Sequence, residues 1–283
     1  MKKLIINADD FALHNSVNNA VIKANTTGVL TSTSIIPSGR CFDSAVDLIR
    51  KNNNIGVGVH LTLVHEKPLS DPVKVKSLVD SEGFFHNNYI DFIKKILKNE
   101  IDYQEVYNEL AAQIAKVKDN GITITHLDSH QHLHVLPRIT DIVIDLALSN
   151  NIKAVRIPAE SFSFLGGYPW NVTRVIGRTG LTFLSKLARF KIGKKLYMPD
   201  HFFGMLAGGN MKEDYLFNII NNLPYGVTEI MMHPADSNRE MNEFYSWKYS
   251  WEDELSALTS DLIKKEINKQ KIELISFGDL VND

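Results

Sequence analysis

The segment at residues 125–134, THLDSHQHLH, holds the densest group of side chains in this chain that could do chemistry. It contains four of the ten histidines together with an aspartate, Asp128. The residues before it, GITIT, are mostly β-branched and favour a strand. Continued alternation would place His126, Asp128 and His130 on one face. Imidazole and carboxylate together suit a divalent metal or a proton-transfer site, whereas a histidine-rich surface loop is the alternative interpretation.

Charged and imidazole side chains also stand where other short apolar runs end. In chain order they are Asp9 and Asp10, His60, then Asp128 and His130, Arg156, Asp200 and His201, and His233. Each has an ordinary structural explanation by itself, such as a helix cap, an ion pair or a buried histidine. Their repeated placement at the same end of successive runs predicts one shared site.

The elements that would position these residues alternate along the chain. Strands are expected at residues 3–8, 29–36, 55–63, 122–127, 153–157, 196–198, 228–232 and 273–277. Helices are expected at 15–26, 43–52, 91–119, 139–149, 173–190, 213–222 and 251–270. This alternation predicts an α/β fold with a parallel sheet, and seven or eight such units fit an irregular (β/α) TIM-like barrel. An open doubly wound sheet is the alternative, but no glycine-rich phosphate loop follows the first strand.

Length and composition limit the class of protein. We expect one domain over residues 1–283, since barrels of this kind commonly use such a length. The net charge of −2 offers no broad basic surface for nucleic acid or for anionic membranes. The single cysteine, Cys41, excludes an intramolecular disulfide, and no apolar run approaches the roughly 20 residues of a membrane span. We therefore expect a cytoplasmic protein.

The residues at the strand ends form a set that is known from metal-assisted hydrolysis. One aspartate and two neutral histidines can hold a divalent cation and leave positions open for water and substrate. A second aspartate can take a proton from water, and a histidine across the site can protonate a leaving group. Asp9, Asp10, His60, His130 and His233 supply these groups. The set predicts hydrolysis of an amide or an ester.

Five motifs resemble those of the YdjC-like carbohydrate deacetylases, which include the chitooligosaccharide deacetylases. They are NADDF at 7–11, TST at 31–33, GVHL at 58–61, HLDSHQHLH at 126–134 and HP at 233–234. The resemblance covers essentially the whole chain, and HLDSH is its most specific motif. It implies an irregular (β/α) barrel, often dimeric, that removes acetyl groups from N-acetylated sugars. It also implies one divalent metal ion, magnesium first and zinc as the alternative.

The resemblance assigns roles to matching residues. His60, His130 and Asp10 become the metal ligands, Asp9 the general base and His233 the general acid. A further group is expected to orient these residues or to contact the sugar, and it comprises Asp128, His126, His132, Arg156, Asp200 and His201. Aromatic candidates for sugar contact are Phe202, Phe203, Tyr245, Trp247 and Trp251.

The chain departs from the family pattern at two positions and in one segment. Ala12 stands where the family often has glycine, and Gln131 replaces a frequent histidine. Residues 161–196 match no family motif and are expected to influence substrate choice. Rival functions are another metal-dependent amidohydrolase or a phosphoesterase on the same barrel, and a non-catalytic sugar-binding protein. The last would not need both Asp9 and His233.

Overall fold

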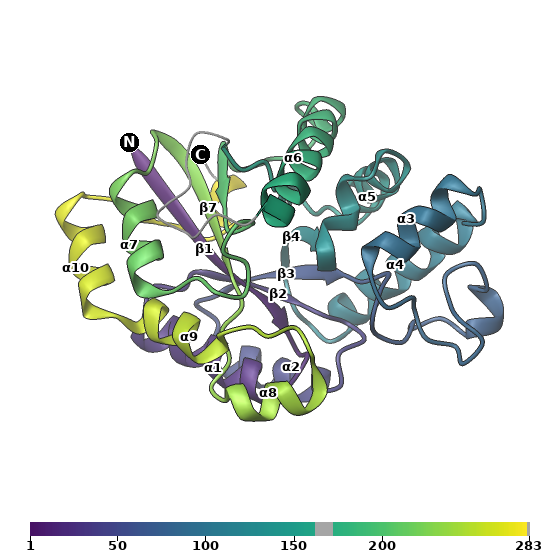
Figure 1. Ribbon diagram of the computed structural model, residues 1–283, viewed down its shortest axis with the longest axis horizontal. Coiled ribbons are helices and arrows are strands. Elements are labelled where there is room, and N and C mark those ends of the chain that lie inside the picture. Colours follow the sequence, from purple (N-terminus) through teal and green to yellow (C-terminus); the bar gives the residue numbers. More distant parts are fainter. Residues whose placement is uncertain (162–171, 282–283) are drawn as a thin grey trace.

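A curled parallel sheet forms the centre of the molecule (Figure 1). The computed structural model describes residues 1–161 and 172–281. Seven strands follow the order β5-β4-β3-β2-β1-β7-β6. Their bounds are β1 Lys2–Phe11, β2 Ser32–Ile35, β3 Gly56–Leu61, β4 Ile124–Ser129, β5 Ala154–Val155, β6 His201–Phe203 and β7 Gly226–Met232. An eighth strand, β8 (Glu273–Leu274), pairs with the start of β1.

The prediction of an irregular (β/α) barrel of seven to eight strands is confirmed. At the two ends of the sheet order, isolated bridges connect β5 to a residue that precedes β6, and β6 to a residue that follows β5. These join Ala154 to Tyr197 and Glu160 to Phe202. Bridges of single residues replace a continuous ladder there, which makes the barrel irregular on this side.

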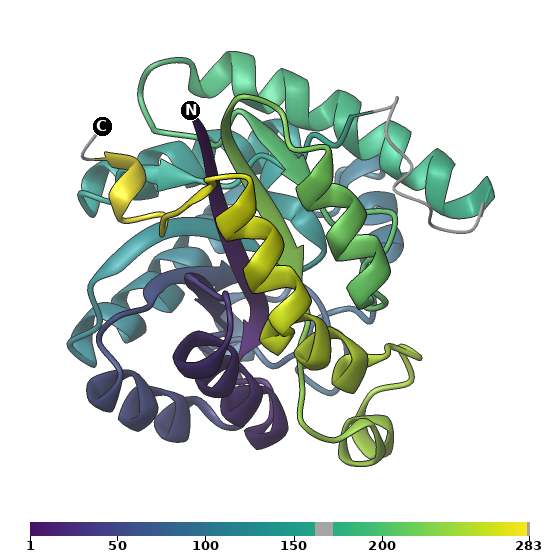
Figure 2. The same ribbon diagram turned by 90° about the vertical axis from the view of Figure 1, so that its left-hand side faces the viewer.

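Helices cover the outside of the sheet (Figures 1 and 2). Their bounds are α1 Asn15–Thr27, α2 Phe42–Lys51, α3 Tyr89–Leu97, α4 Tyr103–Asp119, α5 Pro137–Ser149, α6 Val172–Ile192, α7 Glu213–Asn221, α8 Asn238–Phe244, α9 Trp251–Thr259 and α10 Asp261–Lys269. Within the described residues, no helix is long and apolar enough to cross a membrane.

Two predicted helices are divided in the structure. The pattern at 91–119 forms α3 and α4, and the side chain of Asp102 caps α4 by accepting a hydrogen bond from the Gln104 backbone amide. The pattern at 251–270 forms α9 and α10, and the Ser260 hydroxyl caps α10 in the same way. Both breaks therefore coincide with a capping side chain. Helix α8 lies where the sequence predicts no helix.

The barrel interior changes from apolar to charged along β1. Ile5 packs in an apolar cluster, whereas Asn7 and Asp9 are buried and joined by a hydrogen bond of 2.9 Å. Strict alternation would send Asp10 to the opposite face from Asp9. Instead, Asp10 has a φ of 64° and the register between β1 and β2 shifts between Ala8 and Phe11. This irregularity allows both neighbouring aspartates to reach the same site.

Close packing across the interior fixes the position of β4 against β3. A Cβ atom on Gly58 would lie 2.3 Å from the ring of His126, so only glycine leaves room for this imidazole. The same ring stacks on Phe277, with centroids 3.8 Å apart. His126 is thus part of the interior beneath the strand ends.

Candidate metal centre and active site

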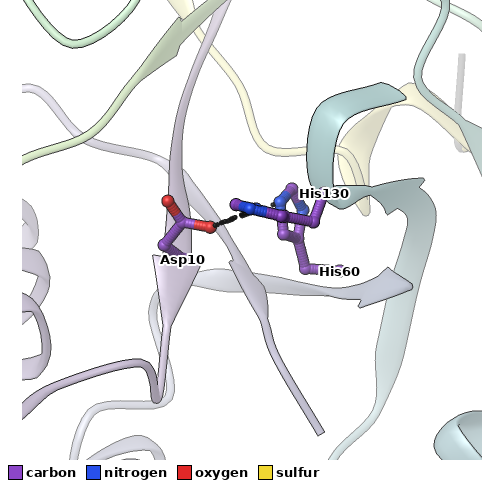
Figure 3. A group of neighbouring side chains, drawn as sticks. All are labelled: Asp10, His60 and His130. Carbon is purple, nitrogen blue, oxygen red and sulfur yellow. Dashed lines mark hydrogen bonds and ion pairs between the residues drawn. The ribbon is translucent and has the colours of Figure 1, made fainter. Parts of the chain in front are cut away.

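Asp10, His60 and His130 come together at the carboxyl ends of β1, β3 and β4 (Figure 3). Asp10 Oδ1 lies 3.0 Å from His130 Nδ1 and 3.5 Å from His60 Nε2. One oxygen and two nitrogen atoms, one from each residue, all lie within 4.8 Å of one another. All three side chains are buried. This is a donor set that a divalent cation can bind.

Asp128 orients the imidazole of His60. The two residues are direct neighbours in the pairing of β3 and β4, and His60 Nδ1 lies 2.9 Å from Asp128 Oδ1. Because an ionised carboxylate only accepts hydrogen bonds, Nδ1 carries the proton and Nε2 faces Asp10. Burial lowers the pKa of His60, but Asp128 and Asp9 outweigh it and raise this pKa to about 9. A cation that binds Nε2 must therefore displace a proton.

Arg156 connects the buried carboxylates of the interior. Its Nη1 and Nη2 donate to the two oxygens of Asp9, at 2.6 and 2.7 Å. Nη1 also lies 2.8 Å from Asp128 Oδ2, and Nε donates to Glu229 Oε1 at 2.7 Å. A single guanidinium thus holds three carboxylates in fixed orientations.

A second group with metal-ligand chemistry, Asp9, His60 and Asp128, shares the same interior. Both of its carboxylates already bind Arg156, and His60 Nδ1 faces Asp128. The positive guanidinium opposes a cation at this second position. The residues present therefore fit one ion at Asp10, His60 and His130, with Asp9 beside it.

His233 follows the end of β7 and lies near the aspartates. Burial raises the pKa of Asp10, but the neighbouring histidines outweigh burial and hold this pKa below its usual value. His130 has the largest lowering effect, and a positively charged His233 contributes to it. The His233 backbone amide donates to the buried Glu254 carboxylate, and its ring packs edge-on against Tyr249 at 5.3 Å. Within the described residues, His233 Nδ1 is buried without a hydrogen-bond partner. This ring nitrogen is thus not engaged by another described group of the protein.

Three residues, Tyr245, Trp247 and Tyr249, form an aromatic wall whose middle member, Trp247, lies beside His130. The Trp247 ring centroid lies 5.5 Å from that of His130 and 4.7 Å from that of Tyr245. Trp247 is half-buried and also contacts His65. The site therefore has a flat apolar side next to its charged centre.

Comparison with known proteins decides the family. The family model described as YdjC-like protein matches residues 3–269. The chain belongs to the YdjC-like family.

Relatives of this YdjC-like protein match over nearly their full length. A protein of Brevibacillus brevis named carbohydrate deacetylase is 31% identical over 279 residues, covering 98% of this chain and 99% of the relative. One of Thermoanaerobacter pseudethanolicus with the same name is 30% identical over 278 residues, with 98% and 99% covered. A solved Enterococcus faecalis structure, provisionally named a cellobiose-phosphate cleavage protein, is 26% identical with a TM-score of 0.81, covering 99% of this chain and 98% of that chain. The predictions of the family and of an enzyme are confirmed.

Two residues predicted for the YdjC-like site lie at the opposite end of the sheet. The sixth strand was expected at residues 196–198 with Asp200 and His201 at its end, but β6 begins at His201. Asp200 accepts a hydrogen bond from the Val227 backbone amide, and His201 Nε2 lies 3.1 Å from the Tyr225 carbonyl oxygen. Both contacts are at the start of β7, so this placement of the strand was wrong.

The other histidines of the HLDSH segment have separate surroundings. His126 lies below the site between Ser34 and Phe277, and its burial lowers its pKa to about 3. His134 Nδ1 lies 2.7 Å from Ser129 Oγ, and its Nε2 lies 3.0 Å from the Arg156 carbonyl oxygen. His132 is buried near Phe202. None of these three belongs to the group around Asp10.

The remaining aromatic candidates are less accessible than Trp247. Phe202, Phe203, Tyr245 and Trp251 are all buried. Part of the unmatched segment 161–196, namely 162–171, lies outside the described residues, and the rest of it is mostly α6.

Sequence reasoning missed Glu229 and His65. Glu229 stands in the apolar run TEIMM, and a lone charge within such a strand is a signal for an interior partner.

His65 follows β3, and its Nε2 lies 2.8 Å from Gln131 Nε2 while its ring contacts those of His130 and Trp247. No spacing rule connects residues 65 and 131. The Gln131 side chain thus contacts His65, which lies beside Trp247 of the aromatic wall. It does not belong to the group of Asp10, His60 and His130.

Proposed function

We propose that this YdjC-like protein is a metal-dependent deacetylase that removes the acetyl group from an N-acetylated carbohydrate, a chito-oligosaccharide or a related amino sugar. The observation that carries the proposal is the group of Asp10, His60 and His130 beside an Asp9 that Arg156 holds in place. The names of the full-length relatives support the same chemistry.

Asp10, His60 and His130 would hold one divalent ion, which would polarise the acetamide and lower the pKa of water. Magnesium is the ion that the family resemblance implies, and zinc is the alternative. Asp128 keeps the protonated nitrogen of His60 away from this position. The cytoplasmic location and the homodimer that the resemblance implies stay predictions.

The reaction requires one group that removes a proton and one that supplies it. Asp9 takes a proton from water, whose oxygen forms a bond to the acetamide carbon. His233 gives a proton to the sugar nitrogen as the carbon–nitrogen bond breaks, so acetate and a free amine result. The two hydrogen bonds from Arg156 keep the Asp9 carboxylate oriented for this transfer.

Trp247 is the best placed of the aromatic residues to contact the sugar. It is half-buried beside His130, whereas the other predicted aromatic candidates are buried. Aromatic faces offer the flat apolar surface against which the C–H groups of a sugar ring can pack.

Acetate release from N-acetylated chito-oligosaccharides tests the proposal. The purified protein, supplied with magnesium or zinc, is expected to release acetate, and Asp9→Asn is expected to reduce kcat by roughly 10²–10⁴. Trp247→Ala is expected to raise KM, while Tyr225→Ala, at the far end of β7, leaves it unchanged.

Full activity in Asp9→Asn would refute the assigned base. Hydrolysis of phosphate esters without acetate release would favour the rival phosphoesterase, and saturable sugar binding without turnover would favour a binding protein.

A further inference from the structure

His65 and Gln131 form a hydrogen-bonded pair beside the proposed metal position. His65 follows β3, whereas Gln131 comes directly after His130 at the end of β4. The centroid of the His65 ring lies 5.3 Å from that of His130 and 5.7 Å from that of Trp247. The pair therefore borders the place where a sugar packed on Trp247 would lie.

The side-chain amide of Gln131 has one orientation that its neighbours allow. Tyr89 begins α3, and its backbone amide, which has no partner within the helix, donates to Gln131 Oε1 at 2.8 Å. Because a backbone amide can only donate, the oxygen of the Gln131 side chain faces Tyr89. The nitrogen of the same side chain lies 2.8 Å from His65 Nε2. Gln131 therefore donates to His65.

This donor fixes the position of the proton on the His65 ring. A carboxamide nitrogen can only donate, so His65 Nε2 is the acceptor and carries no proton. The ring is then neutral, and its proton is on Nδ1. Among the residues that the structure describes, His65 Nδ1 has no hydrogen-bond partner, and this atom is not buried. His65 thus presents an N–H donor that the protein itself does not use.

The backbone of His65 has a conformation that few residues adopt. Its φ is 70°, in the left-handed region that residues other than glycine seldom take. The His65 amide donates to the His86 carbonyl, and the carbonyl of the next residue, Glu66, accepts from the Phe85 amide. These hydrogen bonds hold the backbone that carries the ring. Such conformations are concentrated at sites that bind a ligand.

We propose that His65 is a specificity-determining residue whose Nδ1–H donates to a hydroxyl oxygen of the sugar packed on Trp247, and that Gln131 keeps the proton on Nδ1. The inference rests on the proposed function, because it needs a sugar bound at Trp247. A neutral N–H group selects an oxygen acceptor at this point of the sugar. The assignment also gives a role to Gln131, which stands where the family resemblance implies a histidine.

Two substitutions of His65 separate the donor from the contact with Gln131. The amide nitrogen of asparagine is bonded to Cγ, as Nδ1 is in histidine, whereas the amide nitrogen of glutamine takes the place of Nε2. His65→Asn therefore keeps a donor toward the sugar and loses the contact with Gln131, and His65→Gln does the opposite. With N-acetylated chito-oligosaccharides, His65→Gln should raise KM about threefold to tenfold and change kcat less. The KM of His65→Asn should stay closer to that of the wild type.

The position of the proton can be measured independently of activity. In the full chain with isotope-labelled histidine, nuclear magnetic resonance of the ring nitrogens distinguishes a nitrogen that carries a proton from one that does not. His65, whose signals are identified by their loss in His65→Asn, should show a protonated Nδ1 and an unprotonated Nε2. Gln131→Met cannot donate, so it should give a mixture of the two neutral forms of the ring.

The outcomes separate this inference from the proposed function. A wild type that releases no acetate would refute the proposed function, and the contact between His65 and the sugar with it. If the wild type is active, a KM that is no higher in His65→Gln than in His65→Asn would overturn the assignment of His65 alone. A wild type that carries the proton on Nε2 would overturn it as well.

Discussion

Arg156 joins three buried carboxylates in the interior of the barrel. It contacts Asp9, Asp128 and Glu229, and it is fully buried. Sequence reasoning placed Arg156 among residues that orient the site or contact the sugar, because it follows a strand. The structure adds the partners, which come from β1, β4 and β7 and which no local pattern could pair.

Glu229 gives this network a dependence of stability on pH. Burial raises the pKa of Glu229 from 4.5 to about 7, against the opposing effect of Arg156. The folded protein therefore keeps a proton that the unfolded chain loses above about pH 4.5. Its stability should fall as pH rises from there through about 7, and the loss should be complete above that value.

Glu229→Gln should remove this dependence. Between about pH 5 and about pH 8, the free energy of unfolding of the wild type should fall by about 1–3 kcal/mol more than that of the variant. Urea unfolding at the two pH values measures the difference. Other buried groups, such as Glu160, contribute equally to both proteins and cancel. Identical pH profiles for the two proteins would contradict the assigned proton.

At the scale of elements, the irregular end of β1 makes the site possible. Asp10 and Ala12 have φ values of 64° and 79°, a region that favours glycine. The Ala12 carbonyl accepts a hydrogen bond from the Cys41 amide, and its own amide donates to Asn18, so the conformation is held by its surroundings. A positive φ at position 12 agrees with the glycine that the family resemblance implies there.

Ala12→Gly should therefore not lower the stability of the folded protein as a substitution by glycine usually does. Relief of roughly 1–2 kcal/mol of backbone strain offsets the added freedom of the unfolded chain, so stability should be unchanged or up to about 1 kcal/mol higher. Ala20→Gly, within α1, should lose about 1 kcal/mol or more. Thermal or urea unfolding of both variants provides the comparison. Equal losses would show that Ala12 is not strained.

Strand positions were predictable even for strands as short as β5 and β8, and β6 is the exception. β1, β3, β4 and β7 were predicted from runs of apolar residues that end in a charged group. β6 was misplaced because LYM at 196–198 and HFF at 201–203 are equally short apolar runs. Only the pairing of His201–Phe203 with β7 distinguishes them, and pairing partners are not encoded locally.

For the whole molecule, the alternation of strands and helices was enough to predict that the strand ends share one mouth. The group of Asp10, His60 and His130 follows from that rule. The bridges that join Ala154 to Tyr197 and Glu160 to Phe202 do not, because they depend on contacts between segments that are distant in the sequence. One domain over residues 1–283 stays a prediction.

The central claim is that one cation binds Asp10, His60 and His130 while Asp9 is kept for proton transfer. Calorimetric titration of zinc into metal-free protein tests it most directly. The wild type and Asp9→Asn should each bind one ion per chain, and Asp10→Asn and His130→Ala should lose affinity by about 10-fold to 100-fold or more. Two ions per chain, or binding that is lost in Asp9→Asn and kept in Asp10→Asn, would contradict it.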